Sequence, residues 1–131
     1  MLFLVDHNLE GHALLLSGRI TTLGWLDLLP IRFFTFAKIE LPIYSDDRVV
    51  WRFAQTNQMI LLTANRSMKG ENSLEQVLRE ENTPRSLPVV TIGNANRVLA
   101  DSDYRNRCVD RLIEIVIDLD DYRGSMRLFI P

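Results

Sequence analysis

The sequence predicts a three-layer α/β/α sandwich with a mostly parallel central sheet. Three short apolar runs, at residues 2–5, 59–62 and 89–92, each end in a polar turn, as the interior strands of a parallel sheet do. Segments with helical periodicity lie between these runs, and alternating strands and helices form right-handed crossovers. The chain has 131 residues, of which 47% are hydrophobic, so residues 1–131 are predicted to form a single domain around one core.

The first apolar run is predicted to be a strand that leads into a helix. Leu9, Ala13 and Leu16 recur at helical spacing. Asn8 is the expected cap of this helix, because asparagine side chains accept hydrogen bonds from a first helical turn. Gly18 is its expected end, since glycine weakens a helix interior.

Two further elements are predicted before the second interior strand. Residues 21–29 predict a helical turn that Pro30 stops, and residues 31–36 predict a strand. Ser45 is the expected cap of an amphipathic helix whose first turn contains two aspartates. The chain therefore returns to the second interior strand through a helix with an acidic start.

The second half of the chain continues the alternation. Ser73 and Gln76 have the spacing of a capping box, and the helix that they start is predicted to end at Glu80. Residues 97–120 are predicted to be mostly helical, because their apolar positions fit a period of 3.6. Residues 127–130 are predicted to add an edge strand.

Composition narrows the classes of function. The formal net charge is −2 and charged residues make up 24%, which argues against a basic nucleic-acid coating protein, so any nucleic-acid contact must be a local patch. Cys108 is the single cysteine, which excludes an intrachain disulfide and a CxxC pair and fits a reducing compartment. Asp6 ends the first apolar run far short of a signal-peptide core of about 7–15 residues or a spanning helix of about 20. We therefore expect a cytoplasmic protein without a membrane partner.

Polar residues at the strand ends mark a candidate site. In an open α/β sheet, ligands bind beyond the carboxyl ends of the strands, which places Asp6, Asn65 and the polar turn at residues 93–97 around one crevice. The acidic helix start at Asp46 and Asp47 is expected to face the same crevice. Converging carboxylates repel one another and are commonly stabilised by a hard cation such as Mg²⁺. Such a cation lowers the pKa of a bound water and stabilises charge on a phosphoryl oxygen.

Three segments on these elements resemble the PIN-like domains of the DUF5615 and Mut7-C type. They are FLVDHNL at residues 3–9, SDDRVV at residues 45–50 and ILLTANR at residues 60–66. The resemblance covers residues 1–95 in order and spacing. It implies a PIN-like fold, Mg²⁺- or Mn²⁺-dependent cleavage of RNA, and often the role of toxin in a toxin–antitoxin pair. The partners that it implies are single-stranded RNA and an antitoxin-like protein.

The resemblance also implies the site residues. Asp6 matches the first acid of the family, and Asp46 matches the second, with Asp47 as the alternative. Asn65 stands where the family has an aspartate, and Ser67 stands where a further aspartate often occurs. Asp6, Asp46 and Asn65 are therefore the predicted metal ligands and catalytic residues of a divergent member. An amide oxygen supplies no negative charge, so the affinity for a divalent cation is expected to be lower than in the family.

The predicted site residues also suit purely structural roles. Asp46 and Asp47 both suit the first turn of a helix because the helix dipole favours negative charge there, and Asn65 suits a left-handed turn. Arg66, Lys69 and Arg97 are predicted to contact the phosphates of a nucleic acid. The alternative for these three is solvated loop charge.

The sequence leaves open whether the protein cleaves. One alternative is a non-catalytic PIN-like module that binds nucleic acid or protein. A homodimer is predicted in addition, because Trp25, Phe33, Phe34 and Phe36 crowd one short region and a chain of this size is expected to bury only part of them.

Overall fold

The structure is a computed structural model that describes residues 1–65 and 73–131. Within these residues, the strands form one sheet in the order β2-β1-β3-β4-β5, and every neighbouring pair is parallel. The strands are β1 (Leu2–Val5), β2 (Arg32–Phe34), β3 (Met59–Thr63), β4 (Val89–Ile92) and β5 (Arg127–Ile130). All of the predicted strands are present, and the sheet is parallel throughout.

Helices and short 3₁₀ turns connect the strands. They are η1 (His7–Leu9), α1 (Glu10–Thr22), η2 (Trp25–Asp27), α2 (Asp47–Thr56), α3 (Leu74–Glu81), α4 (Ala95–Ala100), α5 (Ser102–Ile117) and α6 (Leu119–Tyr122). No helix among the described residues has the length and apolar character needed to cross a membrane.

The first helix differs from its prediction at both ends. Leu9, not Asn8, is the cap of α1, since the chain first forms η1. Gly18 lies inside α1, which continues to Thr22. The helix ends where Gly24 adopts a left-handed conformation (φ 78°) and donates its N–H to the carbonyl of Thr21. This conformation suits glycine because it has no side chain to clash with the backbone.

Two other helix boundaries follow from capping. The predicted helix over 97–120 is divided at Asp101, whose side chain accepts a hydrogen bond from the backbone of Tyr104 and so caps α5. The start of α3 is as predicted, because the Ser73 side chain accepts from the backbone N–H of Gln76.

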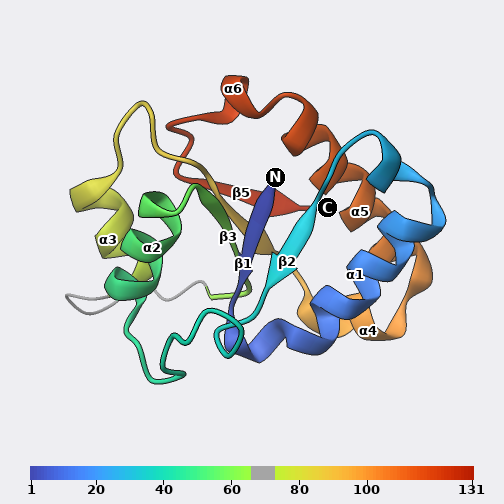
Figure 1. The fold of residues 1–131 in the computed structure, drawn as a ribbon, viewed down its shortest axis with the longest axis horizontal. Helices are drawn as coiled ribbons and strands as arrows, with labels where there is room; N and C mark the ends of the chain where they lie inside the picture. Colours follow the sequence, from blue (N-terminus) through green and yellow to red (C-terminus); the bar gives the residue numbers. More distant parts are fainter. Residues whose placement is uncertain (66–72) are drawn as a thin grey trace.

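The sheet is covered on both faces, which gives the predicted three layers (Figure 1). Alternate residues of each strand point to opposite faces. Phe3 and Ile60 pack on the face covered by α1, α4 and α5, whereas Leu4 and Leu61 pack on the face covered by α2 and α3. The interior strand residues are almost fully buried on both sides, as expected for a parallel sheet between two helical layers.

The aromatic residues behind the dimer prediction are accommodated within one chain. Phe36 is 2% exposed, and Phe33 stacks on Phe3 with ring centroids 5.3 Å apart. Trp25 and Phe34 are half-buried and pack against the two core clusters. The crowding on which the dimer prediction rested is thus relieved by burial, and the dimer itself stays a prediction.

The strand order creates a crevice between two loops. From β1 the chain crosses one face through α1 to β2, and then crosses the other face through α2 to β3, which lies on the other side of β1 (Figure 1). Helix α1 follows β1 and helix α3 follows β3 on opposite faces of the sheet, so β1 and β3 flank a switch point, which is where doubly wound sheets bind ligands. Many unrelated functions share this architecture, so function must be argued from the site.

Candidate functional site

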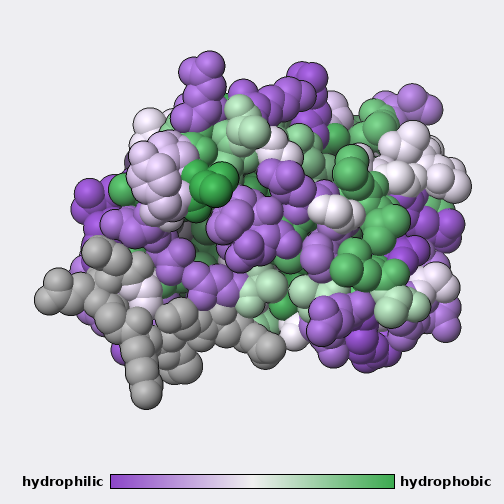
Figure 2. Space-filling model, turned by 90° about the horizontal axis from the view of Figure 1, so that it is seen from below, coloured by the Kyte–Doolittle hydropathy of each residue, from purple (hydrophilic) through white to green (hydrophobic). Residues whose placement is uncertain are grey.

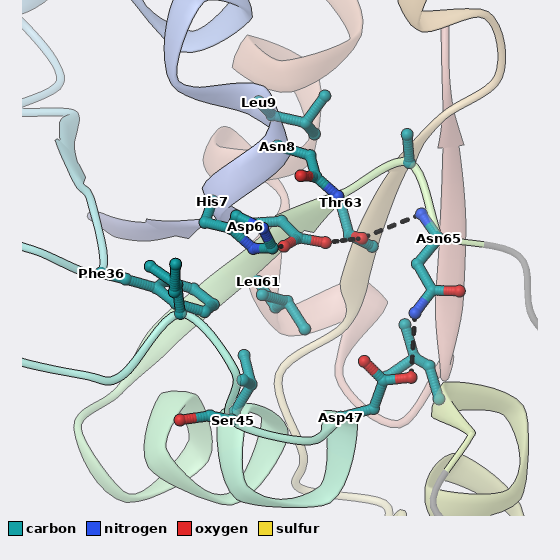
Figure 3. A pocket seen from close by; sticks show the side chains of 14 residues that line it. Asp6, His7, Asn8, Leu9, Phe36, Ser45, Asp47, Leu61, Thr63 and Asn65 are labelled. Atoms are coloured by element: carbon teal, nitrogen blue, oxygen red, sulfur yellow. Dashed lines mark hydrogen bonds and ion pairs between the residues drawn. The ribbon is translucent and has the colours of Figure 1, made fainter.

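A cavity of about 390 Å³ lies at this switch point (Figure 3). Figure 2 shows the molecule from the side on which the strands end, where hydrophilic side chains lie across the middle of the surface. The cavity is lined by residues from the ends of β1 and β3, from η1 and from the start of α2. Its polar lining residues are Asp6, His7, Asn8, Ser45, Asp47, Thr63 and Asn65.

Asp6 is held at the carboxyl end of β1 by its neighbour strand. Its backbone N–H donates to the carbonyl of Leu62 over 3.0 Å, which continues the ladder between β1 and β3. Its carboxylate accepts a hydrogen bond from Thr63 Oγ1 over 2.9 Å, and His7 Nδ1 lies 3.4 Å from its other oxygen. The carboxylate of Asp6 is therefore oriented into the cavity by side chains from both sides.

Thr63 connects Asp6 to Asn65. The Thr63 side chain is buried with 1% exposure, and its hydroxyl accepts the backbone N–H of Asn65 over 2.9 Å while it donates to Asp6. Thr63 was not among the site residues predicted from the sequence. Its position at the end of a buried strand, two residues before Asn65, was the signal that could have identified it, because threonine hydroxyls commonly bond the backbone two residues on.

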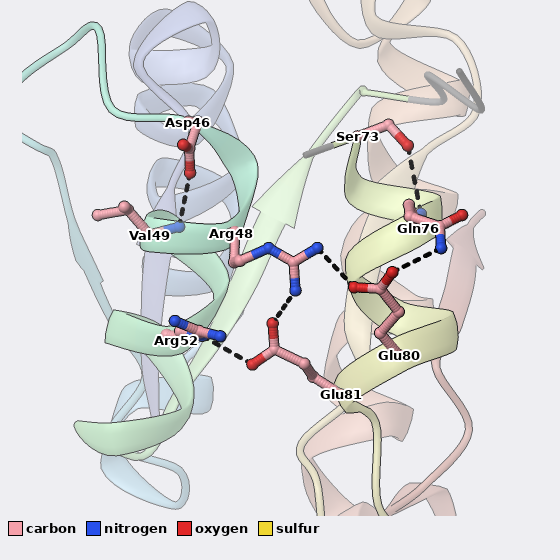
Figure 4. A network of polar contacts seen from close by, with 8 residues as sticks. All are labelled: Asp46, Arg48, Val49, Arg52, Ser73, Gln76, Glu80 and Glu81. Atoms are coloured by element: carbon pink, nitrogen blue, oxygen red, sulfur yellow. Dashed lines mark hydrogen bonds and ion pairs between the residues drawn. The ribbon is translucent and has the colours of Figure 1, made fainter. Parts of the chain in front are cut away.

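Asp47, and not Asp46, is the acid that the structure places in the cavity. The Asp46 side chain is exposed, and its Oδ1 accepts the backbone N–H of Val49 over 2.9 Å, so it is the cap of α2 (Figure 4). Ser45, the predicted cap, lines the cavity instead. Asp47 is the first residue of α2, and its Oδ2 accepts from Asn65 Nδ2 over 2.9 Å. Because the cap of α2 lies one residue later than predicted, Asp46 is used as the cap and its neighbour Asp47 lines the cavity.

The cavity disfavours the charge on Asp47. Burial raises the pKa of the Asp47 carboxyl, and the negative charges of Asp6 and Asp46 raise it further. Hydrogen bonds from the Asn65 side chain and from the backbone N–H of Leu74 act in the opposite direction. Among the described lining residues there is no lysine or arginine. Two carboxylates thus share a cavity in which His7 is the one basic side chain of the described lining.

The oxygen atoms that line the cavity are of the kind that a hard cation binds, but only two of the groups are carboxylates. Two carboxylates, two hydroxyls and two side-chain amides line the cavity, and oxygen ligands are those that Mg²⁺ and Mn²⁺ prefer. No group of three or more His, Cys, Asp or Glu side chains that could hold a metal ion occurs within residues 1–65 and 73–131. A cation here would keep several water ligands, as Mg²⁺ usually does.

Arg97 is the one predicted phosphate-binding residue among the described residues, and it does not line this cavity. Arg97 lies on α4, where its Nη2 pairs with Asp101 at 2.9 Å and its guanidinium lies over the ring of Tyr104. Arg66, Lys69 and Ser67 fall outside the described residues. The polar turn after β4 forms a neighbouring cavity of about 380 Å³, which shares the lining residue Ala64 with the first.

No family model matches the chain, and neither a curated protein nor a solved structure matches it.

Proposed function

We propose that the protein is a PIN-like, metal-dependent ribonuclease whose cation binds between Asp6 and Asp47. The observation that carries this proposal is the shared cavity: both carboxylates line it at the switch point of the sheet, and the hydrogen bonds of Thr63 and Asn65 link one to the other. The raised pKa of Asp47 supports it, because a divalent cation would relieve the unfavourable charge on a buried carboxylate.

The residues divide into those that hold the cation and those that orient its ligands. Asp6 and Asp47 would hold Mg²⁺ or Mn²⁺ with their carboxylate oxygens. When bound, the cation would lower the pKa of a water and stabilise charge on a phosphoryl oxygen of RNA. Thr63 fixes the rotation of the Asp6 carboxylate, and the Asn65 amide fixes that of Asp47. Such support sharpens a site, since ligands that are already oriented need no rearrangement on binding.

One observation favours the alternative, a PIN-like module that binds nucleic acid or protein without cleaving. Asn65 directs its amide nitrogen at Asp47, and its amide oxygen points away from both acids (Figure 3). For the oxygen to become a ligand, the amide must turn and give up its bond to Asp47. A site that keeps two acids and lacks the third would retain the fold and the cavity while it loses cation affinity.

The proposal also includes a substrate, a cellular compartment and a protein partner. A nuclease of this kind acts on single-stranded RNA in the cytoplasm and is held inactive by an antitoxin-like protein. A homodimer is part of the same proposal, although the aromatic residues that suggested it are packed within one chain.

Crystals soaked in MnCl₂ test the proposal. We expect anomalous density between Asp6 and Asp47 in the wild type, and Mn²⁺-dependent cleavage of a labelled single-stranded RNA. Asp6→Asn and Asp47→Asn should abolish both. Asp110→Asn is the matched control, because Asp110 is an exposed acid on α5 outside the cavity. Density without cleavage would favour the binding module, and the absence of both would refute the metal site.

A further inference from the structure

The two cavities at the strand ends are neighbours and together define a path along this edge of the sheet. Ala64 lines both, so the cavity at β1 and β3 adjoins the one at the end of β4. The second cavity is lined by the turn from Ile92 to Asn96 and holds no charged side chain among its described lining residues. The path therefore leads from an acidic end to a neutral polar stretch along the edge of the sheet.

Tyr104 connects the second cavity to a pair of arginines. Its hydroxyl accepts the backbone N–H of Asn94 over 2.8 Å, and its side chain is buried. Two guanidinium carbons lie over its ring, that of Arg97 at 4.5 Å and that of Arg107 at 5.6 Å from the centroid. Cation–π contacts of this kind restrict the arginines and hold them beside the turn that lines the cavity.

The positive charge here is only partly neutralised. Arg97 pairs with Asp101 through Nη2 alone, which leaves its other N–H groups for a ligand. Arg107 has no carboxylate within 4.0 Å among the residues that the structure describes. Arg105 bonds the neutral carbonyls of Val98 and Leu99 at the end of α4. Among the described residues, only one of these three guanidinium groups is thus paired with a carboxylate.

We propose that single-stranded RNA lies along this path, with a phosphate on Arg97 and Arg107 and the following nucleotides over Asn94 and Asn96 towards the acidic cavity. This inference rests on the proposed ribonuclease function, for which it supplies the binding surface. Asparagine amides bond the edges of bases, and only unpaired bases expose all of their edges. A local arginine pair is also how a chain with a net charge of −2 can attract phosphate.

Binding of a labelled 20-nucleotide oligo(U) RNA tests this surface by fluorescence anisotropy. The titrations are run in EDTA, so that the RNA stays intact and the result is independent of the proposed metal site. We expect Arg97→Gln/Arg107→Gln to weaken binding about tenfold and to reduce the slope of log K against log salt by roughly 0.7, since the two arginines share one phosphate and each neutralised phosphate of a single strand contributes about 0.7. Arg97→Lys/Arg107→Lys, which keeps both charges, should retain the wild-type slope.

Arg79→Gln is the control, because Arg79 is an exposed arginine on α3, on the opposite face of the sheet. Circular dichroism verifies that each variant is folded, and Arg107→Gln alone disturbs no ion pair among the described residues. Equal loss in the Arg79 control, an unchanged salt slope in the double glutamine variant, or no binding by the wild type would each overturn the proposal. Manganese density between Asp6 and Asp47 without RNA binding would overturn this surface while the metal site stands.

Discussion

Asn65 donates a hydrogen bond from its side-chain amide to the carboxylate of Asp47 over 2.9 Å, and this bond joins the end of β3 to the start of α2. The amide thereby partly compensates a carboxylate whose charge is disfavoured by burial and by nearby acids. It achieves this without adding charge of its own. A carboxylate in its place would stabilise a bound cation and would repel Asp47 without one.

Asn65→Asp should therefore have opposite effects with and without metal. In EDTA we expect a lower melting temperature than in the wild type, because the hydrogen bond to Asp47 is replaced by repulsion between two carboxylates. In MnCl₂ we expect about tenfold tighter Mn²⁺ binding, equivalent to about 1.4 kcal/mol, and greater cleavage of RNA. Thermal melts and titrations of both proteins measure these effects.

Asn65→Gln is the control for this substitution, since it keeps the amide and changes only the reach of the side chain. A melting temperature of Asn65→Asp that responds to Mn²⁺ no more than the wild type does would assign Asn65 to a purely structural role in the turn. The metal proposal would then depend on Asp6 and Asp47 alone.

The two neighbouring acids at the start of α2 should respond differently to the same isosteric change. Asp46→Asn keeps a cap, because asparagine is as good a cap as aspartate, so both stability and the Mn²⁺ response should remain close to those of the wild type. Asp47→Asn should remove the Mn²⁺ response, since it removes a proposed ligand. Both variants lose one negative charge, so their difference isolates position. The assignment would be reversed if Asp46→Asn were the variant that lost the response.

Stability in the absence of metal should depend on pH through Asp47. Because its pKa is raised in the folded protein, the folded state holds this proton more tightly than the unfolded chain. Its contribution to stability is full below the unfolded-state pKa near 3.8 and is lost as the pH rises through the folded-state pKa. In EDTA, the stability of Asp47→Asn relative to the wild type should therefore increase as the pH rises through this window. Urea unfolding at a series of pH values measures it, and a constant difference would contradict the raised pKa.

The sequence predicted the layers and the crevice because these depend on features that local patterns record. Buried strands show as short apolar runs, and parallel pairing then places Asp6 and Asn65 at one edge of the sheet. Helix ends were less predictable. Gly18 has room on a surface-facing side of α1, and the helix continues until Gly24 adopts the left-handed conformation that ends it.

The choice between Asp46 and Asp47 could not be made from the sequence. Both residues suit a first helical turn, and successive side chains on a helix point about 100° apart, so a shift of one residue decides which of them reaches the cavity. The outcome depends on which aspartate caps the backbone of Val49, and this is fixed by how α2 packs on the sheet through Val50 and Trp51. The hydrogen bond between Asn65 and Asp47 across the cavity likewise depends on tertiary packing.

The side chain of Arg127 is buried, and it should support the site through its contact with Asn65. Arg127, at the start of β5, is 7% exposed, and its Nη1 donates to the carbonyl of Asn65 and to Thr91 Oγ1, each over 2.7 Å. Its Nε pairs with Glu75 of α3 at 3.1 Å. This one side chain thus joins β5 to β4, to the end of β3 and to α3.

Arg127→Met should therefore destabilise the protein strongly. Loss of one partner from a buried pair typically costs about 3–5 kcal/mol, and we expect roughly 2–4 kcal/mol here because Glu75 retains some contact with solvent. Arg52→Met is the matched control: Arg52 also pairs with a glutamate of α3, Glu81, at 2.7 Å (Figure 4), but its side chain is 60% exposed. Exposed pairs contribute little, so the loss of stability of Arg52→Met in urea unfolding should be much smaller.

Arg127→Met should also weaken Mn²⁺ binding, since the carbonyl of Asn65 loses its donor and the amide is held less firmly against Asp47. Equal losses of stability in the two variants would show that the Arg127 contacts contribute no more than a surface pair.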